Sequence, residues 1–492
     1  MPMITPKSSL DSAHKLLEHS ILHHAGEPVG TLAALDPALV APNYAECFIR
    51  DFVPSALVFL MEGKTEIVVN FLRMVLDLRV QQPIILGHER AQGLMPASFR
   101  IPNDGEEEDM PSADFGDRAI GRVAPVDSAL WWTLLLRAYV NTTGDIKLAH
   151  SHEFQEGLRL NLQLYLKENF ETSPALLVPD ASFMIDRRMG VHGHPLEIQA
   201  LFYGMLFTTL ELLLPGPDND HLLAMCKKRL QTLRSYVRIY YWLDAERLNE
   251  IHRYQSEEFG HDVTNVLNIY PESIPDWIDG WLPKDAGYLL GNLGPSRIDF
   301  RFFSFGNLLS ILFGLTTSAQ AEQIMCLFES RWDQLIGEMP VKICYPAVEG
   351  DEWSYTTGSD PKNRPWSYHN GGHWPCLLWA FTGAAIRTGR RDLAKRAVTI
   401  AAARLEQDDW PEYYDGKKGS LIGRRANLRQ VWSAASLIIS HHLLENGSAL
   451  AGFESFTIRD ETPQSASSLR AEKLLQDGGT VNLMMPRERK TG

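Results

Sequence analysis

The stretch RTGRRD, residues 387–392, gives the clearest sign of how this chain folds, because it separates two apolar helical patterns. Gly389 suits the left-handed position just past a helix end, and Asp392 suits the cap of a following helix. The stretch TTGD at 142–145 repeats this chemistry. Short turns of this kind join the two helices of an αα-hairpin. Two further glycines follow apolar helical runs in the same way, namely Gly63 and Gly314.

Helical periodicity continues on both sides of these turns. Ala321, Ile324, Phe328, Trp332 and Leu335 recur at the spacing of one helix face, whereas alternating strand patterns are few and short. We expect about a dozen helices. Many of these helical patterns begin near the following residues: Ser9, Asp51, Lys64, Asp127, Asp145, Pro195, Asn219, Phe302, Gly372 and Asn427.

The arrangement of hairpins and loops predicts the fold class. Besides the helical hairpins, the chain has long loops rich in Gly, Pro, Asp and aromatic residues at 99–126, 251–300 and 345–371. The helical patterns show no fixed repeat length, which weakens the case for a solenoid. We therefore expect an all-α fold, a closed (α/α) barrel whose long loops lie on one face. A plain helical array is the alternative. One catalytic domain is expected over residues 1–454, followed by a polar and poorly ordered tail at 455–492.

The composition limits which classes of ligand the protein can bind and in which compartment it can work. The 492 residues carry 47 Lys and Arg against 61 Asp and Glu, a net charge of −14, which argues against nucleic acid as a partner. The five cysteines are far apart and form no CxxC pair, so neither a disulfide framework nor a zinc site is expected. The N-terminal segment lacks the apolar core of a signal peptide, and the most apolar window, 198–214, is interrupted by Gln199 and Glu211. We expect no membrane span and a cytoplasmic location.

An irregular, charged segment, LLVPDASFMIDRRMGVHGHPLE at 176–197, is the first candidate for a catalytic loop. Pro179 and Gly190 interrupt helical structure, and the segment leads into a long apolar helix. Such a loop can hold an acid against a substrate, and its carboxylates are Asp180 and Asp186. From the residues alone either could be the acid, and a surface loop with internal Asp–Arg pairs is an equally good interpretation.

The segment 349–375 mixes five aromatic residues with Asp, Asn, His and Gly. Sugars present apolar CH faces and many hydroxyls, so aromatic platforms beside amides and carboxylates suit them. Trp366, His369 and Trp374 lie in this segment. The alternative is that these rings only cover the core beneath a loop, and the many glycines and side-chain donors favour sugar binding.

A second carboxylate, Glu412, lies among Trp and Tyr residues in QDDWPEYYDG, where partial desolvation would suit a general base. Surface carboxylates in turns are commoner, so the stronger argument is that glycoside hydrolysis requires two carboxylates and the charged loop supplies the other. Arg50 and Asp51 in NYAECFIRDFVP, 43–54, could bind sugar hydroxyls with charge assistance. Equally, Asp51 could only cap a helix.

His192 and His194 form an HGH pair that is similar to the paired histidine ligands of metal hydrolases. Those ligands normally close a strand, and nothing strand-like precedes His192. We therefore expect no metal site.

Five motifs resemble the neutral/alkaline invertases, a family of sucrose hydrolases, and they occur in the family's order across residues 8–450. They are FIRDFVPSAL (48–57), DFGDRAIGRVAPVDSALWW (114–132), PDASFMIDRRMGVHGHPLEIQALFY (179–203), RPWSYHNGGHWP (364–375) and WPEYYDG (410–416). The resemblance implies an (α/α)6 barrel that hydrolyses sucrose to glucose and fructose with inversion, with no metal or organic cofactor. It also implies a homo-oligomer, in some family members a hexamer, although the sequence shows no interface.

The resemblance also assigns roles to residues. By their places in the motifs, Asp186 matches the general acid and Glu412 the general base. Asp186 would protonate the glycosidic oxygen while Glu412 activates water on the opposite face of the glucosyl ring, and inversion requires carboxyl groups about 6.5–9.5 Å apart. Further sugar-binding candidates are Arg50, Asp51, Asp127, His194, Trp366, His369 and Trp374. Two alternatives stay open: an (α/α)-barrel sugar epimerase that relies on a histidine pair, and a sugar-binding protein without catalysis.

Overall fold

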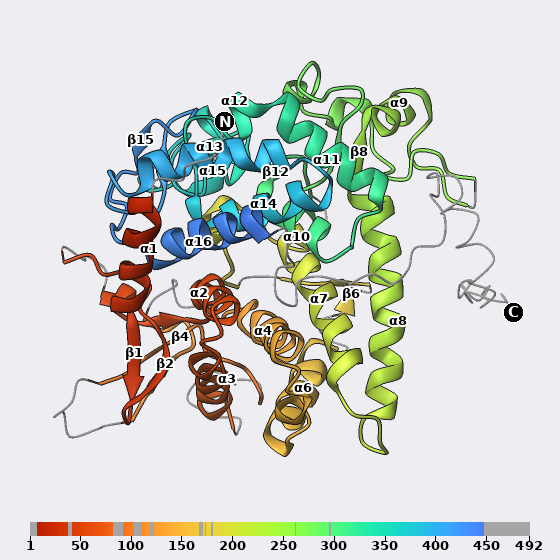
Figure 1. The fold of residues 1–492 in the computed structure, drawn as a ribbon. Coiled ribbons are helices and arrows are strands. Elements are labelled where there is room, and N and C mark those ends of the chain that lie inside the picture. The colour runs from red at the N-terminus through yellow and green to blue at the C-terminus, as the bar shows by residue number, and fades with distance from the viewer. Residues whose placement is uncertain are drawn as a thin grey trace, which may run out of the picture.

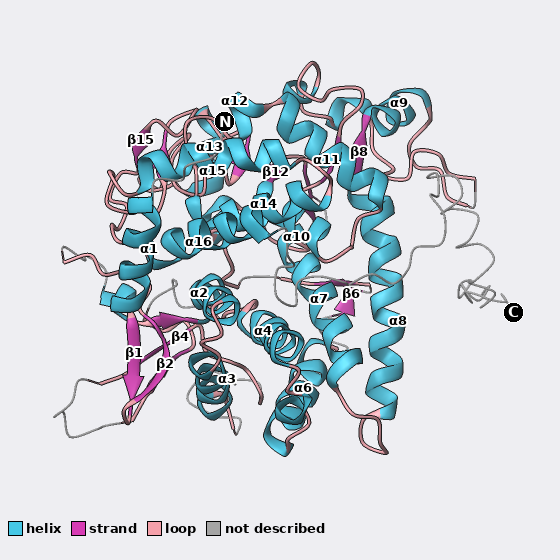
Figure 2. Ribbon diagram, viewed as in Figure 1, coloured by secondary structure: helices cyan, strands magenta, loops and turns pink. Residues whose placement is uncertain are grey.

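The computed structural model describes most of the chain between residues 7 and 446. The described ranges are 7–37, 42–81, 92–102, 110–118, 123–166, 171–172, 174–178, 181–260, 262–294 and 297–446. They form a mostly helical molecule with short strands in small sheets (Figures 1 and 2). The predicted tail at 455–492 and Asp180 lie outside these ranges. Within them, no helix combines the length and the apolar character that crossing a membrane requires.

The α-helices begin and end as follows: α1 Lys7–His19, α2 Ile49–Met61, α3 Glu66–Leu78, α4 Ser128–Thr143, α5 Ile146–Ala149, α6 His152–Tyr165, α7 Leu196–Leu212, α8 Asp220–Tyr236, α9 Ala245–Arg253, α10 Ser304–Leu312, α11 Ser318–Ser330, α12 Trp332–Leu335, α13 Gly350–Thr357, α14 Leu378–Arg387, α15 Arg391–Leu405 and α16 Val431–Asn446. Most begin within a few residues of the predicted positions. However, α14 begins at Leu378 rather than near Gly372, because Pro375 opens a 3-10 turn first.

The strands in the described ranges pair antiparallel. They are β1 Ile21–His24 with β2 Glu27–Thr31, β3 Cys47–Phe48 with β4 Ser98–Arg100 and β5 Ser112–Asp114, β6 Glu171–Thr172 with β7 Ala175–Leu176, β8 Trp242–Asp244 with β9 Gly287–Leu289, β10 Asn292–Gly294 with β11 Arg297–Asp299, β12 Phe302–Phe303 with β13 Cys344–Tyr345, and β14 Tyr414–Asp415 with β15 Leu421–Ile422. These sheets form in the segments of the chain that connect the helices. The predicted loops at 251–300 and 345–371 therefore contain short elements, among them β9, β10 and α13, which are too brief to give a clear sequence pattern.

Six helices form a closed inner ring. In order, α2 packs on α4, α4 on α7, α7 on α10, α10 on α14, α14 on α16, and α16 returns to α2. Most residues of these helices are buried on every face, since helices that are covered on both sides have no polar face. Figure 1 shows the closure, with α16 from the C-terminal end beside α2 from the N-terminal end. The predicted closed (α/α) barrel is confirmed, and a plain helical array is excluded.

A second layer of helices surrounds this ring. Each covers a seam or flank of the ring: α1 packs on α15 and α16, α3 on α2 and α4, α6 on α7, α8 on α7, and α15 on α14 and α16. The outer helix α3 shows the expected two-sided character, because its buried residues recur at helix spacing. The inner and outer layers together make the hairpins of the barrel.

The turns between paired helices follow the predicted glycine chemistry. Gly144 and Gly389 adopt left-handed φ values of 73° and 74° after α4 and α14. The prediction that Asp392 caps the helix is wrong, because α15 already begins at Arg391 and Asp392 lies in its first turn. There its negative charge still interacts favourably with the helix dipole. A capping box does form after another predicted glycine turn, where Thr317 and Gln320 exchange side-chain and backbone hydrogen bonds at the start of α11.

Candidate active site

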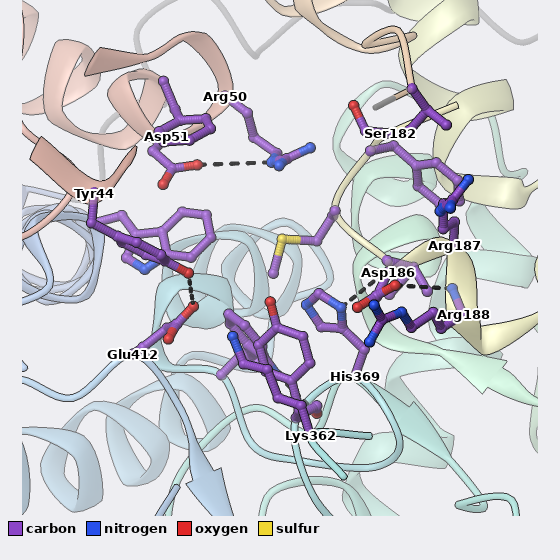
Figure 3. Close-up of a pocket in the computed structure, with 18 residues that line it drawn as sticks. Tyr44, Arg50, Asp51, Ser182, Asp186, Arg187, Arg188, Lys362, His369 and Glu412 are labelled. Carbon is purple, nitrogen blue, oxygen red and sulfur yellow. Dashed lines mark hydrogen bonds and ion pairs between the residues drawn. The ribbon is translucent and has the colours of Figure 1, made fainter. Parts of the chain in front are cut away.

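A cavity of about 340 Å³ lies at the N-terminal ends of the inner helices α2 and α16. Figure 3 shows the residues that line it. Its walls come from the start of α2, the charged loop at 182–188, the segment 362–374, Glu412 and the start of α16. These segments are far apart in the sequence, and closure of the ring brings them together. A cavity of this size suits a small molecule.

Glu412 lies on one wall of the cavity and is held by two partners. Its side chain is only 2% exposed. Tyr44 donates its hydroxyl proton to Glu412 Oε1 at 2.7 Å, and the Asn427 side-chain amide donates to Oε2 at 3.1 Å. The backbone N–H of Glu412 also donates to the Asn427 carbonyl at 2.9 Å. The position of this carboxylate is therefore fixed before any ligand binds.

Asp186 lies across the cavity from Glu412, as Figure 3 shows. It precedes a short 3-10 turn, Arg187–Met189, and its Oδ1 accepts the Arg188 N–H at 2.9 Å. Asn363 donates to its Oδ2 at 3.2 Å. The cap and the amide orient the carboxylate, and its place in the cavity lining leaves it accessible to a ligand.

His369 joins the loop of Asp186 to the aromatic segment. Its Nδ1 accepts the backbone N–H of Asp186 at 2.7 Å, so the ring proton lies on Nε2. Burial lowers the pKa of His369 well below its ordinary value, which keeps the imidazole neutral. The Nε2 atom has no hydrogen-bond partner among the described residues, and the side chain lines the cavity. It is therefore available as a donor to a bound hydroxyl.

Arg50 and Asp51 form the upper wall of the cavity in Figure 3. Arg50 Nη1 donates to Asp127 Oδ2 at 2.6 Å, and its Nε lies 3.8 Å from Asp51 Oδ1. Burial raises the pKa of Asp51 to about 7, opposed by the charge of Arg50 and assisted by that of Glu412. The cap of α2 is Phe48, so Asp51 does not cap this helix. Asp127 stands behind Arg50 and fixes its guanidinium, outside the cavity lining.

A family model described as alkaline and neutral invertase matches residues 13–447 of the chain. This chain belongs to the alkaline and neutral invertase family. It is therefore a glycoside hydrolase. The mitochondrial neutral/alkaline invertase 1 of Oryza sativa subsp. japonica is 51% identical over 441 residues, which cover 88% of this chain and 70% of that protein. The chloroplastic alkaline/neutral invertase E of Arabidopsis thaliana is 48% identical over 450 residues, covering 90% of this chain and 73% of that protein.

Solved structures share the fold of this invertase family member at much lower identity. A bacterial glucoamylase complexed with acarbose has a TM-score of 0.56 at 11% identity, covering 90% of this chain and 56% of that one. A mannosylglycerate hydrolase from Thermus thermophilus, in complex with glucose, has a TM-score of 0.53 at 13% identity, covering 87% of this chain and 98% of that one. At such identities the likeness concerns the fold alone.

The predicted site residues divide into two groups. The cavity lining contains six of them: Arg50, Asp51, Asp186, His369, Trp374 and Glu412. The other three, Asp127, His194 and Trp366, lie outside the lining. Asp127 accepts from Arg50, His194 Nδ1 contacts the Leu293 carbonyl at 2.7 Å, and Trp366 donates to Glu349 at 2.8 Å. In the described part of the invertase, no cluster of three or more His, Cys, Asp and Glu side chains is arranged to hold a metal ion.

Sequence reasoning missed several residues that line the cavity. They are Tyr44, Phe48, Val123, Ser182, Phe183, Met184, Ile185, Arg187, Arg188, Lys362, Tyr368 and Trp432. Most of them lie within the motifs quoted from the sequence, and Tyr44 stands four residues before the FIRDF motif. A motif does not show which of its side chains face the cavity, because the turns of the folded chain decide that.

Proposed function

We propose that this invertase family member hydrolyses sucrose to glucose and fructose by a single displacement with inversion at the glucosyl carbon. Asp186 donates a proton to the glycosidic oxygen, and Glu412 takes a proton from the attacking water. The geometry required is a pair of carboxyl groups about 6.5–9.5 Å apart with room for that water. The positions of the two carboxylates on different walls of one cavity support this assignment.

The partners of each carboxylate suit its proposed role. Glu412 accepts hydrogen bonds from Tyr44 and Asn427, which aim a carboxylate at the water without occupying all of its lone pairs. Asp186 lies beside Arg187 and Arg188, on the side where the fructosyl group would leave. The single observation that carries the proposal is this pair of oriented carboxylates facing a cavity of about 340 Å³.

The remaining wall residues suit a glucosyl ring. Arg50 and Asp51 offer a charged donor and an acceptor for hydroxyls, and His369 Nε2 offers a neutral donor. Trp374 and Tyr368 supply aromatic surface for the CH face of a sugar. We propose Asp127 as the residue that holds Arg50 in place, and direct sugar contacts of His194 and Trp366 stay predictions.

The stereochemistry of the first product tests the mechanism. Sucrose is an α-glucoside, so inversion must release β-glucose before mutarotation. Proton NMR of sucrose with wild-type protein, read in the opening minutes, should show the β anomer. Early α-glucose contradicts the single displacement, and no glucose from folded protein contradicts sucrose hydrolysis.

Amide variants of the two carboxylates test the residue assignment. Glu412→Gln and Asp186→Asn should each lower kcat at least about 100-fold, because each removes a proton-transfer group. His194→Ala should leave some activity, since His194 is neither of the two proposed proton-transfer groups and its imidazole lies outside the cavity lining. Loss of activity in His194→Ala together with an active Glu412→Gln would instead favour the sugar epimerase, which requires a pair of histidines. Sucrose binding without any turnover would favour the binding protein.

We further propose that the enzyme works in the cytoplasm, as a homo-oligomer and without a cofactor. All five cysteines are free thiols, which fits a reducing compartment, although named relatives occur in mitochondria and chloroplasts. Subcellular fractionation and sedimentation velocity would measure location and subunit number, including the hexamer implied by the family resemblance. Activity that survives chelation would support a reaction without a metal ion.

A further inference from the structure

Three chain segments lie side by side next to the cavity, and backbone hydrogen bonds join them. Segment 372–374 bonds to 341–343 through two short contacts, Trp374 N–H to the carbonyl of residue 341 at 2.7 Å and residue 343 N–H to that of residue 372 at 2.9 Å. On its other side, His373 and Tyr414 exchange two hydrogen bonds of 2.9 and 2.8 Å. The segment that contains Tyr414 is called the outer segment, and it follows directly after Glu412. The middle segment, 372–374, follows shortly after His369.

The side chain of Lys342 links the same segments a second time. It is fully buried, with 0% exposure. Its Nζ lies 2.8 Å from His373 Nε2, 3.1 Å from the Gly371 carbonyl and 3.0 Å from the Lys417 carbonyl. The Trp366 ring covers it at 5.0 Å. An ammonium group has three protons, and each of them has an acceptor here.

The tautomer of His373 allows it to accept a hydrogen bond from Lys342. Its Nδ1 lies 2.5 Å from the Met339 carbonyl, which makes Nδ1 the protonated nitrogen and leaves the Nε2 lone pair for Lys342. Burial lowers the pKa of His373 well below its ordinary value, so the ring stays neutral. Gly419 permits the close approach of the next turn, because a Cβ there would lie 2.8 Å from the His373 ring.

Neutral dipoles, rather than a carboxylate, surround this buried charge. Burial raises the pKa of the Cys344 thiol, on the same segment as Lys342, to about 11. The ammonium of Lys417, near Tyr414, lies 5.3 Å from the centre of the Trp366 ring. Beyond Cys344, Arg301 is paired with Asp299. Among the described residues, Lys342 has no acidic partner. Burying a cation without a counter-charge costs stability, so packing alone does not explain a lysine here.

We propose that Lys342 is a positioning residue for the reaction. Its ammonium connects the segment that follows Glu412 to the segment that carries His369 and Trp374. In this way it keeps the proposed base at a fixed position relative to the wall of the cavity that faces the sugar. This inference rests on the proposed roles of Glu412 and His369. A small displacement of a reacting group can cost up to about 100-fold in rate, which is why a contact behind the wall can matter to kcat.

The proton on Lys342 gives this tie a pH dependence. Burial lowers the pKa of Lys342 to about 7. Above that pH a neutral amine offers two N–H groups to three acceptors, so one link is lost and kcat should fall. The effect on stability has the opposite sign. The unfolded lysine keeps its proton up to a pH of about 10.4, so its contribution to the free energy of unfolding rises between about pH 7 and pH 10.

Steady-state kinetics on sucrose from about pH 6 to pH 9 test the proposal, with thermal unfolding followed on the same samples. In wild-type protein, kcat should fall toward alkaline pH without a matching loss of thermal stability. Lys342→Met should lower kcat about 10- to 100-fold with a smaller change in KM. Lys342→Arg keeps the positive charge at all these pH values, so its kcat should lose much of the alkaline decline. Asp51 titrates in the same range, and the arginine variant separates the two groups because Asp51 is unchanged in it.

Lys417→Met is the matched control. It removes a cation over the same Trp366 ring and leaves the Lys417 carbonyl in place, so kcat should stay within about twofold of wild type. A folded Lys342→Met with wild-type kcat overturns the proposal, as does a Lys342→Arg variant with an unchanged alkaline decline. If neither variant folds, a wild-type kcat that does not decline above neutral pH still overturns the proposal. Wild-type protein that releases no glucose contradicts the proposed function itself, whereas wild-type activity with these contrary results contradicts the role of Lys342 alone.

Discussion

At the scale of single residues, the site depends on groups that hold the reacting carboxylates as much as on the carboxylates themselves. Glu412 is placed by Tyr44 and Asn427, and Asp186 by Asn363 and the backbone of its own turn. His369, from the segment 362–374, accepts a hydrogen bond from the backbone of Asp186 beside it. The proposed acid and base therefore each have partners from distant parts of the chain.

Tyr44 provides a direct test of this positioning. Tyr44→Phe removes the hydroxyl that donates to Glu412 Oε1 at 2.7 Å and keeps the ring. Because a hydrogen bond to a charged group contributes about 1.5–3 kcal/mol, we expect kcat on sucrose to fall roughly 10- to 100-fold. Tyr288→Phe is the control, since its hydroxyl donates to the Phe300 carbonyl in the core, away from the cavity lining, and should affect stability more than kcat. Wild-type kcat in Tyr44→Phe would show that this hydroxyl does not position the base.

At the scale of elements, turn chemistry sets where the helices of the hairpins begin. The capping box at Thr317 and Gln320 satisfies two backbone N–H groups at the start of α11, immediately after the glycine turn that ends the preceding helical segment. Turns at Gly144 and Gly389 use the same left-handed glycine without a side-chain cap on the next helix. The glycine is the shared signal, and the cap varies from turn to turn.

Removing the cap of α11 should lower stability without changing the chemistry. Thr317→Ala is expected to reduce the free energy of unfolding by about 1 kcal/mol, because the Gln320 N–H loses its acceptor. Thr232→Ala, on an exposed interior position of α8, should cost nothing or add slightly to stability, because alanine is the better helix former. Denaturant unfolding of both variants measures the difference, and equal stabilities would mean that this cap contributes little.

At the scale of the whole molecule, ring closure is the feature that makes the site. Helix α2 from the beginning of the chain packs against α16 from its end, and the residues that line the cavity come from both. Tyr44 and Glu412 meet across this junction. The site therefore cannot form in any half of the barrel alone.

A cavity in the closing helix tests how tightly the ring is coupled. Ile439 in α16 is fully buried, so Ile439→Ala should lower the free energy of unfolding by about 2–5 kcal/mol. Differential scanning calorimetry should show one transition shifted to lower temperature, because the six inner helices stabilise one another. The exposed Leu421 provides the control, and Leu421→Ala should leave the transition nearly unchanged. A transition that splits in two would show that the halves of the barrel unfold separately.

Local chemistry in the sequence determined the hairpins, the positions of most helices and the motifs around Asp186 and Glu412. Helix spacing and glycine turns depend on neighbours only a few residues away, so they can be recognised in a single sequence. The family resemblance then chose Asp186 from two candidate acids and named the reaction.

Only the tertiary structure decided which side chains converge. It brought Tyr44 to Glu412, turned Asp127 behind Arg50, left His194 and Trp366 outside the cavity lining, and buried Lys342 between three segments. These outcomes depend on contacts between residues that are often hundreds of positions apart, such as Tyr44 and Glu412, and no local pattern records such contacts. They exist because the inner helices close into a ring, which fixes the direction in which each connecting segment faces.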